Sequence, residues 1–145
     1  LFELAFPEIV NYVDATFNTI PDKAHRAIAG LSMGGMHTLM ITANYPEMFN
    51  YIGLYSAGVD FSHLNMEEVP AYANLDAKLT KLAQGNPKLY WIACGNEDWL
   101  LPANKRLMER MDKDGLKYTF HESPRGHLWS NWRQYSLLFI PQLFK

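Results

Sequence analysis

Ser32 lies in the sequence GLSMGG, residues 30–35, which carries the strongest chemical signal in the chain. The apolar run AIA (residues 27–29) precedes it, and residues with helical spacing follow it. A serine on a sharp turn between a strand and a helix has its hydroxyl lifted clear of the backbone, and small neighbouring residues allow the turn. The pattern predicts that Ser32 is a nucleophile. Because a serine hydroxyl is a weak nucleophile at neutral pH, it requires a base and a carboxylate that orients the base.

His127 is the predicted base. In sites built on this kind of turn the groups follow the chain order serine, acid, histidine. His127 comes after the last predicted strand, at the end of the loop PRGH (residues 124–127). Of the other histidines, His25 precedes the strand that leads to Ser32, His37 lies one turn into the next helix, and His121 lies within a strand. His63 lies in a long loop and is a candidate for lining the site.

Asp98 is the predicted acid. It follows a strand that ends at Cys94, and ligands gather at the carboxyl ends of parallel strands. Two other carboxylates remain open as alternatives. Glu97 is the adjacent residue, and Asp60 comes shortly after the preceding strand.

The backbone N–H of Met33 is predicted to bind the oxyanion that forms when a serine attacks an ester. Such an oxyanion requires preorganised N–H donors. We expect the second donor to come from a loop upstream of the Ser32 turn, outside this chain.

Three tryptophans stand beside the predicted acid and base. Trp99 follows Asp98, and Trp129 and Trp132 follow His127. Two interpretations are open: these rings pack in the core, or they form a wall for an aromatic acyl group or a sugar ring. Trp99 is the preferred candidate for substrate binding, with Trp129 beside it.

Alternating strands and helices must position these groups. Near-continuous apolar runs predict strands buried on both faces, and apolar residues at three- and four-residue spacing predict helices. Pro7 fits the first helix only in its first turn. The predicted strands cover residues 25–31, 51–56, 88–94 and 117–122, and the predicted helices cover 2–17, 34–45, 75–83, 102–113 and 129–144. The alternation favours an α/β fold with four parallel strands and Ser32 after the first.

The composition excludes several classes of function. The 145 residues are enough for one core, and the formal net charge is −2 with no basic run, so we expect no nucleic-acid partner. The single Cys94 excludes a disulfide framework and a multi-cysteine metal site, and we expect it to be a buried strand residue. No apolar stretch approaches the roughly 18 residues of a membrane span. The predicted chemistry requires neither a metal nor a cofactor.

Three segments together resemble the putative esterase (esterase D-like) family. RAIAGLSMGG (26–35) resembles its serine turn, and CGNED (94–98) resembles its acid loop. GHLWSNWR (126–133) is similar to the Gly-His-x-Trp-x-x-Trp signature of its carbohydrate esterase branch. The resemblance implies a three-layer α/β-hydrolase fold with helices on both faces of a parallel sheet. It also implies a serine carboxylesterase that removes feruloyl or acetyl groups from plant polysaccharide such as xylan. Arg125 departs from the family, in which a second glycine is common at this position.

The resemblance covers residues 1–145 as the C-terminal half of one α/β-hydrolase domain. We expect the N-terminal strands and the second oxyanion donor to belong to a preceding segment, which would be the partner of this one. Without it, the strand before Ser32 would form an unprotected sheet edge. The resemblance implies a secreted or periplasmic protein. The alternatives are a small-molecule esterase, thioesterase or acyltransferase of the same family, and an inactive fragment or carbohydrate-binding relative.

Overall fold

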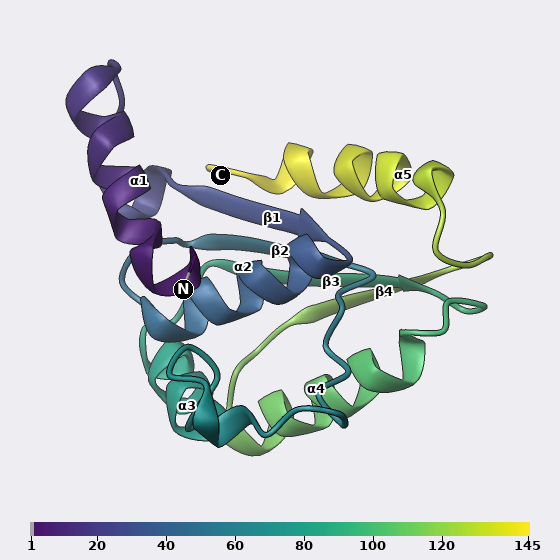
Figure 1. Cartoon of the computed structure of the whole chain (residues 1–145). Helices are drawn as coiled ribbons and strands as arrows, with labels where there is room; N and C mark the ends of the chain where they lie inside the picture. The colour runs from purple at the N-terminus through teal and green to yellow at the C-terminus, as the bar shows by residue number, and fades with distance from the viewer. Residues whose placement is uncertain (1) are drawn as a thin grey trace.

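A parallel four-stranded sheet is the framework of the computed structural model, which describes residues 2–145 (Figure 1). The strands lie side by side in chain order: β1 (Ala27–Leu31), β2 (Tyr51–Tyr55), β3 (Leu89–Gly95) and β4 (Thr119–Ser123). Leu31 is paired with Tyr55, and Gly95 is paired with Ser123, so the strands end at one common edge of the sheet. The four parallel strands confirm the topology predicted from the sequence.

Helices cover both faces of the sheet (Figure 1). α5 lies on one face, and α2, α3 and α4 lie on the other, while α1 packs against α2. Three short 3₁₀ turns complete the chain at Lys23–His25, Met66–Glu68 and Ile140–Gln142. The helices are α1 (Phe2–Thr16), α2 (Met33–Asn44), α3 (Leu75–Gln84), α4 (Leu101–Asp114) and α5 (Trp129–Phe139). This is the three-layer α/β arrangement that the resemblance implied.

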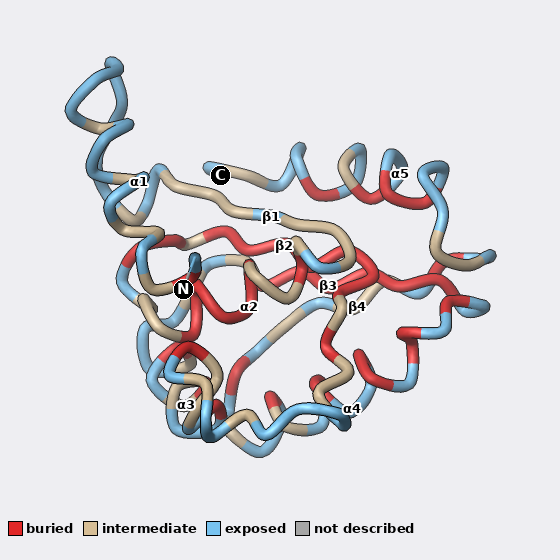
Figure 2. Tube along the Cα trace, viewed as in Figure 1, coloured by how far each residue is buried: buried red, intermediate tan, exposed pale blue. Residues whose placement is uncertain are grey.

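Strand β2 shows how the sequence fills two cores at once. Successive side chains of a strand point to opposite faces. Ile52 and Leu54 enter the core beneath α2, α3 and α4, whereas Tyr51 and Tyr55 enter the core beneath α5. In Figure 2 the central strands β2 and β3 are coloured almost entirely as buried. Burying one aliphatic side chain contributes about 1.5–3 kcal/mol, so β2 and β3 form a fixed base for the loops at their ends.

β1 is an edge strand, and its residues are half-buried except Ala29, which is exposed (Figure 2). An apolar groove of about 430 Å³ lies between β1 and α5, lined in part by Leu31 and Trp129. A second apolar groove of about 740 Å³ lies between β1 and α1, lined in part by Ile9 and Val13. The strand that leads to Ser32 therefore has apolar surface on both faces and one unpaired edge within the described residues.

Most helix ends lie within one residue of the sequence-based prediction, and three differences bear on the fold. α5 ends at Phe139 and not at Phe144, because Pro141 has no N–H to donate to a carbonyl one turn earlier. Ile140 keeps a right-handed helical conformation and begins the 3₁₀ turn Ile140–Gln142. α2 begins at Met33, one residue earlier than predicted, directly after Ser32. Pro7 lies in the second turn of α1 and not in the first. The Glu3 carbonyl consequently lacks its usual helical partner.

Glu3 is a buried carboxylate that joins α1 to the rest of the fold. Its Oε1 accepts a hydrogen bond from the Tyr72 hydroxyl at 3.1 Å and lies 2.8 Å from His37 Nδ1. Burial by itself raises the pKa of Glu3. Hydrogen bonds from its own backbone N–H, from His37 and from Tyr72 outweigh burial and hold this pKa below its ordinary value of 4.5. Glu3 therefore favours the ionised form, which these donors stabilise.

Candidate active site

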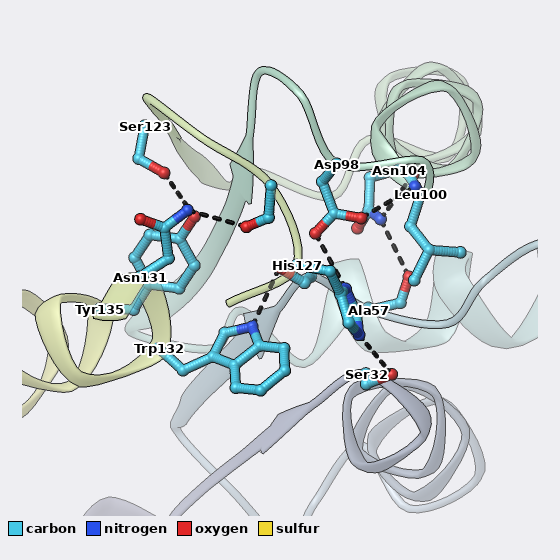
Figure 3. A network of polar contacts seen from close by, with 12 residues as sticks. Ser32, Ala57, Asp98, Leu100, Asn104, Ser123, His127, Asn131, Trp132 and Tyr135 are labelled. Atoms are coloured by element: carbon cyan, nitrogen blue, oxygen red, sulfur yellow. Dashed lines mark hydrogen bonds and ion pairs between the residues drawn. The ribbon is translucent and has the colours of Figure 1, made fainter. Parts of the chain in front are cut away.

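Ser32, Asp98 and His127 come together at the carboxyl edge of the sheet (Figure 3). Ser32 follows β1, Asp98 follows β3, and His127 lies between β4 and α5. The His127 Nε2 atom lies 2.9 Å from Ser32 Oγ, and its Nδ1 atom lies 3.0 Å from Asp98 Oδ2. The imidazole thus joins the serine hydroxyl to the carboxylate in one line of hydrogen bonds, an arrangement that can move a proton away from Ser32.

Ser32 has a backbone conformation that is rare for a residue with a side chain. Its φ is 53° and its ψ is −119°, and its N–H donates to the Tyr55 carbonyl at 2.9 Å. Gly30 makes this turn possible, because a Cβ there would collide with the carbonyl of Gly34. A Cβ on Gly35 would lie 2.7 Å from the Cβ of Ala57, whereas a Cβ on Gly34 meets no atom within 4 Å. The turn therefore requires glycine at positions 30 and 35, and position 34 has free space in this structure.

Asp98 is the carboxylate that contacts His127. It is 4 % exposed, and its Oδ1 accepts a hydrogen bond from the Leu100 N–H at 3.0 Å. Glu97 is exposed, and within residues 2–145 its carboxylate makes no hydrogen bond to His127. Asp60 accepts from the Ser62 N–H and pairs with Arg106 at 3.5 Å. Of the three carboxylates, Asp98 is the one that lies within hydrogen-bond distance of His127, and it remains the candidate acid.

The loop that carries His127 is held by hydrogen bonds from α5 and from the acid loop. The Asn131 side-chain amide donates to the carbonyls of Pro124 and Gly126, at 3.0 Å each (Figure 3). The Arg125 carbonyl accepts from the Glu97 N–H at 3.0 Å, which ties this loop to the acid loop. These bonds fix the three residues that directly precede His127 in the loop.

Arg125 has a φ of 69°, in the left-handed region that favours glycine. A glycine would suit position 125 because it adopts a positive φ without strain. Arginine adopts that φ here. Gly95 leaves space for the close approach, because a Cβ on it would collide with the Arg125 carbonyl. The departure from the family pattern therefore leaves the loop in place and adds backbone strain.

The remaining histidines have other neighbours. His25 pairs with Asp22 at 2.7 Å, His37 pairs with Glu3, and His121 stacks on Trp91 with ring centroids 5.9 Å apart. His63 is exposed, and within residues 2–145 no recorded hydrogen bond or ring contact joins it to Ser32, Asp98 or His127. Its predicted role in lining the site has no support from these contacts.

Met33 is the first residue of α2, so no carbonyl of its own helix accepts its N–H. The helix dipole adds partial positive charge at this end. The Ser32 carbonyl, in contrast, accepts from Gly35, Met36 and Gly58, the last at 2.7 Å. The N–H of Met33 is thus held on a rigid turn and remains a candidate oxyanion donor.

Two indole rings contact the imidazole of His127. The Trp99 ring lies with its centroid 4.2 Å from that of His127, tilted by 41°, and this side chain is 71 % exposed. The Trp132 ring lies 4.8 Å away at 86° and is only 8 % exposed. Trp129 is 64 % exposed and packs on Trp132 at 5.1 Å. Trp99 and Trp129 are therefore open to a ligand, whereas Trp132 belongs to the packed interior.

Cys94 is fully buried beneath the acid, as expected from the sequence. Burial, with the nearby charge of Asp98, raises the pKa of its thiol to about 12. A thiol that stays protonated is a poor nucleophile. Ser32 therefore has no competing thiolate at this site.

Several supporting residues were not predicted from the sequence. The Asn104 side-chain amide donates to the Ala57 carbonyl at 2.9 Å and to the Leu100 carbonyl at 3.0 Å, which connects the loop after β2 to the acid loop. Ser56 accepts a hydrogen bond from the Trp132 indole at 3.1 Å. The only sequence signal for Ser56 is its position at the end of a strand next to β1.

Two further properties of the described residues concern cofactors and membranes. No group of three or more His, Cys, Asp and Glu side chains in residues 2–145 is arranged to hold a metal ion. Over the same residues, no helix is both long and apolar enough to cross a bilayer.

Known proteins resemble the chain in sequence. The family model described as "Putative esterase" matches residues 6–138. An endo-1,4-beta-xylanase/feruloyl esterase of Xylanibacter ruminicola is 55 % identical over 51 residues, which are 35 % of this chain and 7 % of that protein. An acetyl esterase of Caldicellulosiruptor saccharolyticus is 27 % identical over 157 residues, covering 88 % of this chain and 58 % of that protein. The chain therefore spans less than two thirds of either relative.

Among solved structures, the chain resembles FphF of Staphylococcus aureus, a fluorophosphonate-binding serine hydrolase determined with substrate bound. The TM-score is 0.82 at 20 % identity, and the match covers 97 % of this chain and 62 % of that one. At this identity the likeness concerns the fold, which agrees with the three-layer arrangement described above.

Proposed function

The chain belongs to the Putative esterase family, and we propose that it carries the catalytic residues of a serine carboxylesterase. The observation that supports this most strongly is the continuous hydrogen bonding from Ser32 through His127 to Asp98. The strained turn at Ser32 and the free N–H at the start of α2 support the same conclusion.

In the proposed mechanism, Ser32 Oγ attacks the carbonyl carbon of an ester while His127 Nε2 takes the hydroxyl proton. Asp98 holds the imidazole by its Nδ1–H and stabilises the imidazolium. The carbonyl oxygen becomes an oxyanion that accepts a hydrogen bond from the Met33 N–H. When the C–O bond to the leaving group breaks, His127 gives its proton to the departing alcohol, and the acyl group remains on Ser32.

The second half of the reaction releases the acid. A water molecule gives a proton to His127 Nε2 and attacks the acyl carbon, which forms a second oxyanion at the same N–H. Collapse of this intermediate breaks the bond to Ser32 Oγ, which recovers its proton from His127. No step needs a cofactor.

We propose feruloyl or acetyl esters of plant polysaccharide, such as xylan, as the substrates. The two relatives described above are named for feruloyl and acetyl esterase activity, and one of them is also a xylanase. The exposed ring of Trp99 beside the imidazole and the exposed ring of Trp129 on Trp132 suit an aromatic acyl group or a sugar. A secreted or periplasmic location would fit a polymeric substrate.

We further propose that the edge of β1 pairs with strands from the N-terminal half of the same domain, which would also supply the second oxyanion donor. The unpaired edge and the two apolar grooves beside it support this partner. A coverage of 58 to 62 % of the two longer matches leaves room for such a segment in those proteins.

The proposal is tested by treating the full-length protein and its Ser32→Ala variant with a fluorophosphonate and measuring intact mass. We expect one adduct that maps to Ser32 and none on the variant. An adduct on another residue, or aryl ester turnover retained by Ser32→Ala, would contradict the assignment.

A second experiment separates the substrate classes. Turnover of methyl ferulate, an alkyl acetate and S-formylglutathione is compared at equal enzyme concentration. Preference for the thioester would favour the small-molecule alternative, and no turnover of any ester would favour a non-catalytic relative.

A further inference from the structure

Ser56 shares a positive φ with Ser32, which is unusual for a residue with a side chain. It follows β2 directly, its φ is 46°, and its N–H donates to the Ala93 carbonyl of the neighbouring strand at 2.8 Å. Ser32 stands likewise at the end of β1 and donates to the carbonyl of Tyr55. A positive φ is unfavourable for a residue with a side chain, and it persists where the surrounding structure holds the backbone in place. The structure therefore contains a second serine that is held in a strained position at the same edge of the sheet.

The hydroxyl of Ser56 has a specific partner. It is fully buried, and its Oγ accepts a hydrogen bond of 3.1 Å from the indole Nε1–H of Trp132, which lies 76 positions later in the chain. A buried indole N–H needs an acceptor, so this bond decides where the Trp132 ring can lie. The bond thereby joins the end of β2 to the beginning of α5.

Trp132 in turn contacts the predicted base. Its ring stands nearly perpendicular to that of His127, with centroids 4.8 Å apart (Figure 3). The hydrogen bonds that join His127 to Asp98 and Ser32 are made by the two ring nitrogens, in the plane of the ring. Such bonds restrain rotation about the line through those nitrogens only weakly. Packing from the side restricts this rotation, and Trp132 supplies it from a buried, hydrogen-bonded position.

Trp99 is the other ring that touches His127, and it is held less firmly. Its side chain is largely exposed, and no hydrogen bond of its indole N–H is found within residues 2–145. Of the two indoles, only Trp132 is both buried and anchored.

We propose that Ser56 and Trp132 are a positioning pair that sets the orientation of the His127 imidazole. The inference rests on the proposed role of His127 as the base. Trp132 acts by packing against the imidazole, and Ser56 acts through Trp132. Neither residue touches the substrate in this assignment.

Ser56→Ala is the cleanest test, because it removes one hydroxyl and keeps both rings. NMR of histidine- and tryptophan-labelled protein follows the His127 ring C–H resonances, which depend on the position of the ring relative to the indoles. The Trp132 indole N–H resonance shows directly whether the hydrogen bond is lost. We expect both sets of resonances to shift in Ser56→Ala, and the rate of fluorophosphonate capture to fall about tenfold, since small misplacements of a catalytic group cost rate.

Two further variants make the test specific. Trp132→Phe keeps an aromatic ring but loses the N–H donor. The double variant Ser56→Ala/Trp132→Phe should slow fluorophosphonate capture no more than Trp132→Phe alone, because Ser56 acts only through the Trp132 ring. Tyr135→Phe is the matched control, because Tyr135 lies on the same helix as Trp132. The change removes the 2.6 Å hydrogen bond between the Tyr135 and Ser123 hydroxyls. We expect that control to leave the His127 resonances and the capture rate unchanged.

The proposal is overturned if the Trp132 N–H resonance shifts in Ser56→Ala while the His127 resonances stay where they are. It is also overturned if Tyr135→Phe moves them as much. An absence of adduct on the unsubstituted protein would count against the proposed esterase function, and the ring resonances would still decide whether the pair positions His127.

Discussion

The Nε2 atom of His127 lies 2.9 Å from the Oγ atom of Ser32, and this contact joins the two outer strands of the sheet. Ser32 follows β1 at one edge, and His127 follows β4 at the other. With neighbouring strands about 4.8 Å apart, the loop after β4 has to reach back over roughly 14 Å. The site therefore depends on the loops that are fastened to the ends of β2 and β3.

Asp98→Asn should leave the fold intact and lower kcat/KM for an alkyl acetate by about 10⁴-fold in the full-length protein. An amide in place of the carboxylate no longer holds the imidazole in the productive tautomer. Steady-state kinetics measure the effect. Glu97→Gln is the matched control, since Glu97 is adjacent but exposed. An equal loss in the control would argue against Asp98 as the orienting acid.

Gly30→Ala and Gly34→Ala should have opposite effects on stability. A Cβ at position 30 collides with the Gly34 carbonyl, whereas a Cβ at position 34 has free space within α2. We expect Gly30→Ala to lower the free energy of unfolding by several kcal/mol, as overpacking and backbone shifts do. Gly34→Ala should raise it by about 0.5–1 kcal/mol. Urea titrations compare the two. Destabilisation by Gly34→Ala as large as that by Gly30→Ala would contradict the geometry of the turn.

Arg125→Gly should be tolerated, and Arg125→Ile should be destabilising. The φ of 69° suits glycine and is unfavourable for a β-branched side chain. Arg125→Gly relieves backbone strain but gives the unfolded chain more freedom. The two effects together should raise the free energy of unfolding by about 0–1 kcal/mol. For Arg125→Ile we expect the free energy of unfolding to fall by about 1–3 kcal/mol. Thermal unfolding tests both, and equal stability of the two variants would show that this backbone shape does not matter.

Stability should fall in acid partly because of Glu3. Its pKa is lower in the folded protein than its ordinary value of 4.5, so the unfolded chain binds the proton more tightly. The stabilisation is present above pH 4.5 and is lost as the pH falls through the folded-state pKa. Glu3→Gln should remove this part of the pH dependence.

The measurement for Glu3 is the free energy of unfolding at several values between pH 7 and pH 3. Glu8→Gln, an exposed position on the same helix, serves as the control and should retain the acid dependence of the original protein. If both variants show the same profile, the contacts of Glu3 with His37 and Tyr72 contribute nothing to it.

Trp99→Ala should raise KM for methyl ferulate by about fivefold and change KM for an alkyl acetate little. An aromatic pair is worth about 0.5–1.5 kcal/mol beyond its buried area, and only the feruloyl group can form one. Tyr12→Ala, which removes an exposed aromatic ring from α1, is the control and should affect neither ester. A similar change for both esters would indicate that Trp99 serves His127 and not the acyl group.

The sequence was sufficient to predict the elements and to single out Ser32 and His127, which the fold brings together. Continuous apolar strands, helical spacing and the serine turn are local patterns, so they are visible without coordinates. The choice among Asp98, Glu97 and Asp60 was not decided by local pattern, because neighbouring acidic residues differ only in where the folded loop points them.

Other features depend on contacts between distant segments and have no local signal. The hydrogen bond from Trp132 to Ser56 spans 76 positions, and the free space at Gly34 depends on what packs against the turn. The end of α5 could have been placed better, since Pro141 is visible in the sequence and cannot donate a hydrogen bond within a continuing α-helix. His63 was proposed from its loop alone, and its side chain has no recorded contact with the central residues.

The position of β1 has a consequence for how the nucleophile is maintained. Within the described residues this strand has a hydrogen-bonded neighbour on one side only, so its amides should exchange with solvent through local opening, at a smaller free energy than those of β2 and β3. Ser32 follows this strand directly, so each opening of β1 also separates Ser32 from His127. A segment that docks on the free edge would suppress the opening and stabilise the Ser32–His127 pair, which makes docking and nucleophile assembly a linked equilibrium.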